Sequence, residues 1–388
     1  MTEHSITLIL TLSLLIWSSP FVAKLVRIPT PPIEIILGSI FAFLGFIGSN
    51  DYFDMIAHIG FLYLMFLAGM EVDLKQILNS PRSLIRKSLL FIVILSLLAL
   101  LSGWILNLKP IIVVSLPLIS IGLLASLTKI YGKEQSWLQL AFIVGILGEV
   151  ASIAGLTILD AASTVGFGWG LLVKIAYLLA FLGVIFLIYH FLKLLFWWFP
   201  ELRTALMPKY DTSDRDIRLA ISLFFILIAV TLALDLELAL GAFIAGVAIS
   251  AFFHHEKKLE EKMSSLGFGF LVPLFFIHVG ASFDLSALAI QGVVSGALLI
   301  TFLMIMIRIL AAFVLKMIDG SKNALLAGLS LSMPLTLLIA VATIGYETHL
   351  IDLLNYYRLI LASLFEILIS MISIKLIHAY QEKTDKAV

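Results

Sequence analysis

Cysteine is absent from the 388-residue sequence, and charged residues make up only 13% of it. Without cysteine the chain has no disulfide, no thiol nucleophile and no cysteine-ligated metal centre. Lys and Arg number 25, and Asp and Glu also number 25, so the formal net charge is +0. A neutral chain lacks the basic field that draws nucleic acid to a protein surface. We therefore expect no nucleic-acid partner.

Hydrophobic residues, in contrast, make up 61% of the chain. Soluble domains contain about 45–50% apolar and about 25% charged residues. A water-soluble globule could not cover this much apolar surface, whereas a bilayer can surround it. The composition therefore predicts an integral membrane protein and excludes a water-soluble enzyme. Its glycine-rich stretches lack the strand–loop–helix context of a phosphate-binding loop, so no cofactor is expected.

Long apolar runs follow one another along the whole chain. A helix that crosses about 30 Å of hydrocarbon needs about 20 mostly apolar residues. Windows of that length predict an all-α fold with about thirteen transmembrane helices. The predicted segments are 5–26, 31–48, 54–71, 84–107, 111–131, 136–161, 169–199, 216–234, 238–254, 266–282, 286–318, 322–345 and 354–379.

The charges of the loops indicate an orientation. Basic residues follow the odd-numbered segments, and acidic residues follow the even-numbered ones, with Lys109 as the main exception. Because basic loops stay in the cytoplasm, the N-terminus is predicted outside and the C-terminus inside. The protein is thus expected to be a multi-pass protein of the inner (cytoplasmic) membrane.

Residues 1–388 are interpreted as a single transmembrane domain without a soluble regulatory domain. The second to sixth and the ninth to thirteenth segments form two five-helix blocks of opposite orientation. Inverted repeats of this kind are common among transporters. A separate regulatory subunit is left open.

Two ionisable residues of opposite sign lie deepest in the predicted membrane segments. Glu149 is in the sixth segment, beside Gly145 and Gly148, and Arg308 is in the eleventh. Charges at this depth cost about 2.5–3.5 kcal/mol on insertion scales and mark functional sites. We expect Glu149 and Arg308 to pair. Burial favours the protonated form of a carboxyl group and a guanidinium favours the ionised form, so Glu149 can titrate near physiological pH. The alternative is a static structural ion pair.

Glycine, proline and hydroxyl residues interrupt the fifth and twelfth segments, at 117–128 and 328–336. Interrupted helices expose backbone groups to a central ion site. Ser126 and Thr128 are therefore predicted to complete, with Glu149, a site for a hard alkali cation, and Ser152 is a secondary candidate. The alternative is an ordinary proline kink in each helix.

Three further polar residues are secondary candidates. Glu34 is interpreted mainly as a structural residue that reaches water from the inner end of a short helix. His278 is interpreted as a hydrogen-bonded helix contact rather than a proton relay. Glu366, in the last segment, is ambiguous.

Four short segments carry recognisable spacings: Arg27–Gly38 (Pro-x4-Glu-x3-Gly), Gly60–Glu71 (ending Gly-hydrophobic-Glu), Leu240–Gly246 (Gly-Ala-Phe-x-Ala-Gly) and Pro273–Gly280 (Pro-hydrophobic-Phe-Phe-x-x-x-Gly). In this order they resemble the bacterial monovalent cation:proton antiporters, the group of sodium/proton antiporters and Kef-type potassium efflux transporters. The resemblance spans essentially the whole chain.

The resemblance implies an inverted-repeat fold with two crossed broken helices. It implies a mobile core, here about 54–161 and 266–379 in part, and a dimerising panel, about 5–48 and 238–254. Glu149 falls at the second acidic position of the family and Arg308 at its basic position. Gly148 occupies the first acidic position. A homodimer is also expected from the resemblance.

The preferred function is a secondary active transporter that exchanges Na⁺ or K⁺ for protons by alternating access. One titrating carboxylate predicts electroneutral exchange, because arginine keeps its proton. The alternatives are a passive cation channel or leak, and a membrane sensor that shares the fold without transporting. The choice between Na⁺ and K⁺ stays open.

Overall fold

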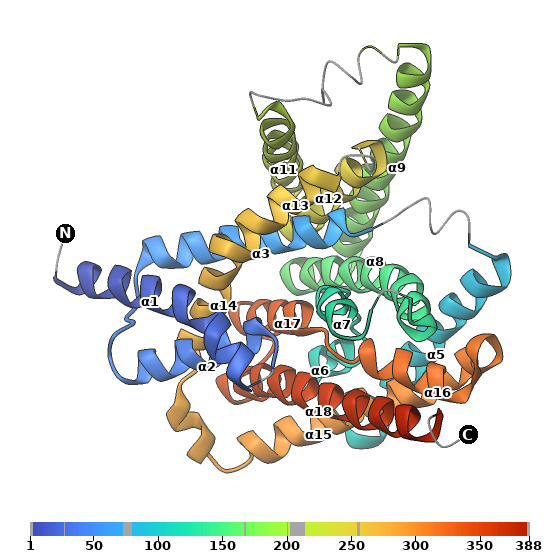
Figure 1. Cartoon of the computed structure of the whole chain (residues 1–388). Coiled ribbons are helices and arrows are strands. Elements are labelled where there is room, and N and C mark those ends of the chain that lie inside the picture. Colours follow the sequence, from blue (N-terminus) through green and yellow to red (C-terminus); the bar gives the residue numbers. More distant parts are fainter. Residues whose placement is uncertain are drawn as a thin grey trace. The chain divides into compact units, whose positions relative to one another are not determined.

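The computed structural model describes residues 3–26, 28–72, 80–132, 134–166, 168–199, 201, 214–253 and 257–385. All regular structure in these ranges is helical (Figure 1). Every predicted membrane segment contains a helix, so the prediction of about thirteen membrane helices is confirmed. The chain divides into two compact units, unit 1 (Met1–Phe21, Glu34–Leu78 and Leu156–Ala281) and unit 2 (Val22–Ile33, Asn79–Gly155 and Ser282–Val388).

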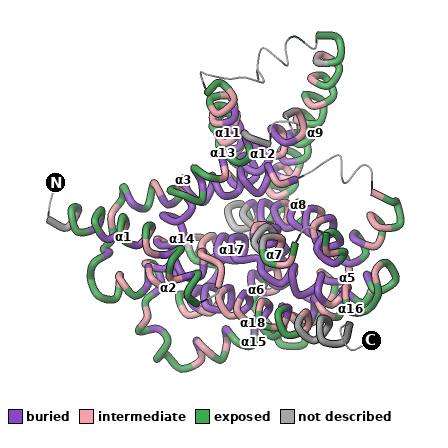
Figure 2. The backbone as a smooth tube through the Cα atoms, in the orientation of Figure 1, coloured by how far each residue is buried: buried purple, intermediate pink, exposed green. Residues whose placement is uncertain are grey.

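Unit 1 contains most of the helical residues before residue 72 and the helices between residues 169 and 281. They are the first part of α1 (Glu3–Val26), α2 (Thr30–Phe43), α3 (Asp51–Met70), α9 (Trp169–Trp198), α11 (Arg215–Ala233), α12 (Leu238–Phe253), α13 (Lys257–Leu266), a π-helical turn at Gly267–Leu271 and α14 (Val272–Ala281). Helix α3 packs against α12 and α14, and α12 also packs against α11. The second half of α3 and most of α12 are buried, whereas α9 is largely exposed (Figure 2).

Glycines set the close approach of α3 and α12. A Cβ atom built on Gly246 would lie 2.0 Å from the carbonyl oxygen of Phe66, and one on Gly69 would lie 2.0 Å from that of Phe243. Both distances are far below van der Waals contact, so only glycine permits this spacing. Small residues commonly bring helix backbones together in membranes. The Gly-Ala-Phe-x-Ala-Gly run therefore serves helix packing.

Unit 2 contains the two interrupted helices. Its elements are α5 (Arg82–Leu106), α6 (Pro110–Ser115), α7 (Leu124–Tyr131), most of α8 (Ser136–Val165), short 3-10 turns at Leu285–Ala289 and Phe313–Leu315, α15 (Val293–Ala312), α16 (Lys316–Ser330), α17 (Leu335–Glu347) and α18 (Leu353–Asp385). Helix α15 packs against α18 and α5, and α17 packs against α18 and α6.

The chain leaves helical geometry at both predicted interruptions. Residues 116–123, here called the first break, separate α6 from α7, and residues 331–334, the second break, separate α16 from α17. Pro117 and Pro334 lie in these breaks, and neither has a backbone N–H to continue a helical hydrogen-bond ladder. The predicted pair of broken helices is confirmed.

The predicted panel and core can be compared with the two units. The panel ranges 5–48 and 238–254 lie largely in unit 1. The core ranges are divided, since α3 and α14 belong to unit 1, where both pack together. The assignment of a mobile core and a dimerising panel stays a prediction.

Gly246→Ala tests the glycine contact between α3 and α12. The added methyl group would press on the Phe66 carbonyl, and overpacking of this kind lowers the free energy of unfolding by about 1–3 kcal/mol. The measurement is the thermal unfolding midpoint of the purified protein in detergent. Gly183→Ala in α9 is the matched control, because nothing lies within 4 Å of its added Cβ. Equal midpoints for the two variants would contradict this account of the interface.

Candidate functional site

Glu149 lies near the middle of α8, with its side chain completely buried in unit 2. Its Oε1 accepts a hydrogen bond from Ser120 Oγ at 3.1 Å, and its Oε2 accepts one from the backbone N–H of Ile121 at 3.3 Å. Both donors belong to the first break. A buried carboxylate without such donors would be costly. The broken helix therefore supplies the polar groups that Glu149 needs.

The broken helix of the second break also contributes a hydroxyl group, that of Thr336, to the surroundings of Ser120 and Glu149. Ser120 Oγ and Thr336 Oγ1 lie 3.4 Å apart. Because the one hydroxyl proton of Ser120 is donated to Glu149, Thr336 is the donor of this pair. Thr336 is in the first turn of α17, directly after the second break. Three oxygen-bearing side chains, from α8 and from both broken helices, thus form one hydrogen-bonded chain that ends at the Glu149 carboxylate.

Two glycines of α8 make room for these breaks. A Cβ atom on Gly145 would lie 2.7 Å from Cγ2 of Ile121 and 3.2 Å from Cδ2 of Leu331, so side chains of both breaks meet at this glycine. A Cβ atom on Gly148 would lie 2.5 Å from Cδ1 of Ile119. Gly148, at the first acidic position of the resemblance, therefore faces a packed isoleucine, which leaves no space for a second carboxylate.

Ser152 also holds the first break, from the face of α8 that carries Glu149. Its Oγ accepts a hydrogen bond of 2.9 Å from the backbone N–H of Ile119. It lies three residues after Glu149, a spacing that places two side chains on one side of a helix. Three successive residues of the break, Ile119 to Ile121, are therefore anchored to α8. Ser152 acts here on the backbone rather than on the carboxylate.

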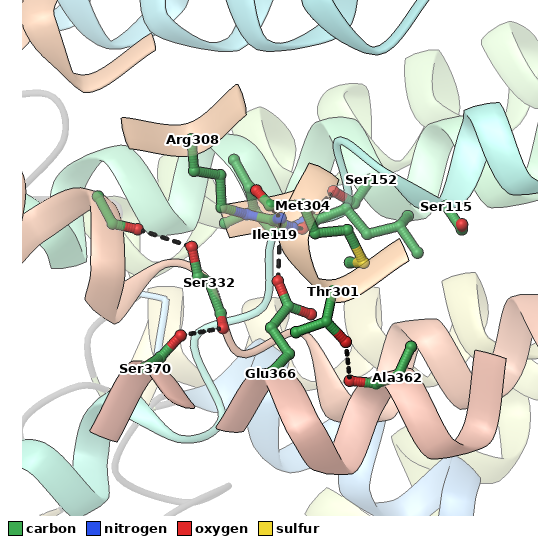
Figure 3. Close-up of polar contacts among 12 residues, drawn as sticks. Ser115, Ile119, Ser152, Thr301, Met304, Arg308, Ser332, Ala362, Glu366 and Ser370 are labelled. Carbon is green, nitrogen blue, oxygen red and sulfur yellow. Dashed lines mark hydrogen bonds and ion pairs between the residues drawn. The ribbon is translucent and has the colours of Figure 1, made fainter. Parts of the chain in front are cut away.

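The expected ion pair between Glu149 and Arg308 is wrong. Arg308 Nη1 lies 3.1 Å from Glu366 Oε1, and both side chains are completely buried (Figure 3). Arg308 also donates hydrogen bonds to the carbonyl oxygens of Met304 and Leu118. The reason is helix packing: α15, which carries Arg308, packs against α18, which carries Glu366. Loop charges and hydropathy do not indicate which helices are neighbours.

The predicted ligands Ser126 and Thr128 lie in α7, beyond the first break. Thr128 is half-buried and gives no hydrogen bond to Glu149, whose donors are Ser120 and Ile121. The side chain of Ser126 lies outside the described residues.

Ser120 and Thr336 are the hydroxyl residues that sequence analysis missed. They lie three residues after Pro117 and two residues after Pro334, respectively. A hydroxyl residue shortly after the proline of a break is the signal that could have found them.

Glu34 and His278 both belong to unit 1. Glu34 is only 3% exposed and accepts a hydrogen bond of 3.1 Å from Ser19 Oγ, so the expected extension to water is wrong. His278 Nε2 lies 2.8 Å from Oδ1 of Asp54 at the start of α3, which confirms the interpretation as a helix contact. Neither residue belongs to the group around Glu149.

The oxygen atoms around Glu149 suit a hard cation. Carboxylate and hydroxyl oxygens are the ligands that such cations prefer, whereas nitrogen and sulfur ligands select other metals. Within the described ranges, no group of three or more His, Asp or Glu side chains could hold a metal ion. A single carboxylate with neutral hydroxyls matches one positive charge, which either a proton or a monovalent cation can supply.

Ser152→Ala tests the anchoring of the first break. The substitution leaves the buried N–H of Ile119 without an acceptor, which costs about 1–3 kcal/mol. We expect a lower thermal unfolding midpoint in detergent. Ser102→Ala is the matched control, because Ser102 Oγ donates only to the Leu98 carbonyl one turn away in α5. A midpoint for Ser152→Ala as high as that of Ser102→Ala would refute the anchoring role.

The sequence of this chain is similar to those of known proteins. YjbQ of Bacillus subtilis, which carries the name of a Na(+)/H(+) antiporter, is 27% identical over 384 residues, which cover 92% of this chain and 60% of YjbQ. The chain thus spans less than two thirds of that relative. The Na(+)/H(+) antiporter of Enterococcus hirae is 26% identical, with 88% of this chain and 89% of the relative covered.

A solved structure and a family match complete the comparison. The sodium proton antiporter MjNhaP1 of Methanocaldococcus jannaschii has the same fold, with a TM-score of 0.66, 17% identity, and 95% of this chain and 96% of that chain covered. Residues 9–379 match the transmembrane sodium/hydrogen exchanger family. The match covers nearly the whole chain, and this protein therefore belongs to the sodium/hydrogen exchanger family.

Proposed function

We propose that this protein is a secondary transporter that exchanges a monovalent cation, Na⁺ or K⁺, for protons by alternating access. The observation that carries the proposal is the buried Glu149 carboxylate, which is hydrogen-bonded to Ser120 and Ile121 of a broken helix. Discontinuous helices commonly build the ion sites of secondary transporters. Family membership and the names of the relatives support the same activity.

Competition for one carboxylate provides the exchange. When Glu149 is protonated it is neutral and cannot balance the charge of a cation. When it is ionised, its two oxygens and the hydroxyl oxygens of Ser120 and Thr336 offer lone pairs to a cation, after the hydroxyl protons have rotated away. The Ile121 N–H is a donor only, so it holds the carboxylate without ligating. Whether the site faces the inside or the outside of the membrane, it then carries either a proton or a cation.

The exchange is proposed to be electroneutral. Glu149 is the carboxylate bonded to the first break, and Gly148 faces Ile119 where a second acid would stand. Arg308 cannot release its proton, and its charge is paired with Glu366. One proton and one monovalent cation then give the site the same net charge.

The proposed orientation has the N-terminus outside and the C-terminus in the cytoplasm of an inner membrane, on the evidence of the basic loops. A C-terminal green fluorescent protein, which fluoresces only when folded in the cytoplasm, tests it. If this fusion is stable but does not fluoresce, and a periplasmic reporter fused to the same end is active, the C-terminus lies outside and the proposed orientation is wrong.

A homodimer remains part of the proposal. Helix α12, the ninth predicted segment, is mostly buried within unit 1, so it offers little surface to a partner. Helix α1 instead exposes large apolar side chains, including Ile9, Leu10 and Trp17. Because the chain has no native cysteine, Leu10→Cys gives a unique cross-linking site. Absence of a cross-linked dimer in lipid would argue against α1 as the interface.

Glu149→Gln should abolish exchange in proteoliposomes that contain an internal pH dye. The amide resembles the carboxylate in shape but neither titrates nor balances a cation. The assay imposes a pH gradient and measures cation uptake against its own gradient for Na⁺ and K⁺. Glu134→Gln, the same change at an exposed position of unit 2, is the control and should transport normally.

The same assay separates the alternatives. A channel would dissipate gradients but never move the cation uphill, and a sensor would move none. Normal exchange by folded Glu149→Gln would remove Glu149 from the mechanism.

Electroneutrality is tested with sodium as the substrate in liposomes whose membrane potential is clamped by valinomycin and potassium. With no sodium or proton gradient, an imposed potential should drive no net exchange. Exchange driven by the potential alone would require a second charge carrier and would refute the one-for-one stoichiometry.

A further inference from the structure

The first break is held by a second helix, α15, in addition to α8. Arg308 Nη2 donates a hydrogen bond to the carbonyl oxygen of Leu118. The next three residues of the break are those held by Ser152 and Glu149 through Ile119, Ser120 and Ile121. The position of Leu118 therefore helps to determine where the Ser120 hydroxyl and the Ile121 amide lie relative to the carboxylate.

Glu366 in turn fixes Arg308. Its Oε1 accepts from Arg308 Nη1, and neither side chain has any solvent exposure. The pair is incompletely satisfied, because Arg308 Nε and Glu366 Oε2 are buried without a hydrogen-bond partner. Buried ion pairs are often no more stabilising than apolar residues of the same size, and incomplete ones less so. Stability alone is thus a poor explanation for two charges at this depth.

The face of α18 that carries Glu366 also contacts the second break. Ser370, one helical turn after Glu366, donates a hydrogen bond of 3.1 Å to the carbonyl oxygen of Ser332 (Figure 3). Residues four apart lie on one side of a helix. Helix α18 therefore holds the second break directly through Ser370 and the first break indirectly, through Glu366 and Arg308.

We propose that Glu366 is a positioning residue for cation exchange: by orienting Arg308 on the Leu118 carbonyl, it holds the first break in the arrangement that places Ser120 and Ile121 on Glu149. This role rests on the proposed function. Glu366 itself touches neither Glu149 nor its hydrogen-bond donors. Its loss should weaken cation binding at Glu149 rather than remove the titrating group.

The first test is transport kinetics in proteoliposomes. Glu366→Gln keeps the shape and one acceptor but removes the charge. A charge-assisted hydrogen bond is roughly twice as strong as a neutral one, so Gln at this position should hold Arg308, and through it the first break, less firmly. We therefore expect the KM for the cation to rise about tenfold, with a smaller change in maximal rate. Glu366→Asp, which keeps the charge, should restore part of the affinity.

The second test does not depend on transport. Gly122→Cys places a unique thiol in the first break, since the chain has no native cysteine and the new Cβ would meet only Ser120 Oγ at 3.8 Å. Its rate of maleimide labelling reports how firmly the break is held. We expect several-fold faster labelling when Glu366→Gln is added. If the Glu366→Gln variant does not fold, Arg308→Lys provides the same measurement, because lysine lacks the two guanidinium nitrogens that contact Glu366 and Leu118.

Thr301→Ala is the matched control. Thr301 Oγ1 donates to the Ala362 carbonyl, one turn before Glu366, so the variant removes another buried contact between α15 and α18 without touching a break (Figure 3). It should change neither the labelling rate nor the KM. Unchanged labelling in folded Glu366→Gln, an unchanged KM, or equal effects of Thr301→Ala would overturn the proposal. If the wild-type protein exchanges no cation, the proposed function fails, and labelling alone decides whether Glu366 positions the break.

Discussion

Backbone N–H and C=O groups within a membrane need partners inside the protein, and in the first break side chains supply several of them. Its Leu118 carbonyl is bonded to Arg308, its Ile119 amide to Ser152 and its Ile121 amide to Glu149. A continuous helix would satisfy these groups internally. Breaking it creates donors and acceptors that polar side chains of α8 and α15 must meet, and this requirement explains why ionisable residues lie so deep in an otherwise apolar unit.

Glu149 therefore has two tasks that depend on each other. It satisfies the backbone of the broken helix, and it is the carboxylate proposed to bind a proton or a cation. A change in its charge alters the hydrogen bonds from Ser120 and Ile121, so occupancy of the site acts directly on the break. The Thr336 hydroxyl extends this connection to the second broken helix. In the proposed mechanism, binding at Glu149 and the positions of the broken helices are thus coupled by contacts between adjacent groups.

The two units use different interactions. In unit 1, α3 and α12 approach closely because Gly69 and Gly246 have no side chains, and backbone packs directly against backbone. In unit 2, the breaks are surrounded by hydrogen bonds and a buried ion pair. Glycine contacts of the first kind tolerate no added atom. Polar contacts of the second kind can exchange partners, which suits the ion site proposed at Glu149.

The membrane helices, both breaks and Glu149 could be predicted from the sequence, because hydropathy, proline and a lone acid in an apolar run are local signals. Gly145 and Gly148 were visible beside Glu149, but only the structure shows that the side chains of Ile121 and Ile119 pack against them. The partner of Arg308 could not be predicted, since Glu149 and Glu366 are equally plausible until the neighbours of α15 are known. Ser120 and Thr336 were hidden for the same reason: many membrane serines and threonines bond only to their own helix. Which hydroxyl faces a carboxylate depends on how separate helices pack, and only the tertiary structure decided that.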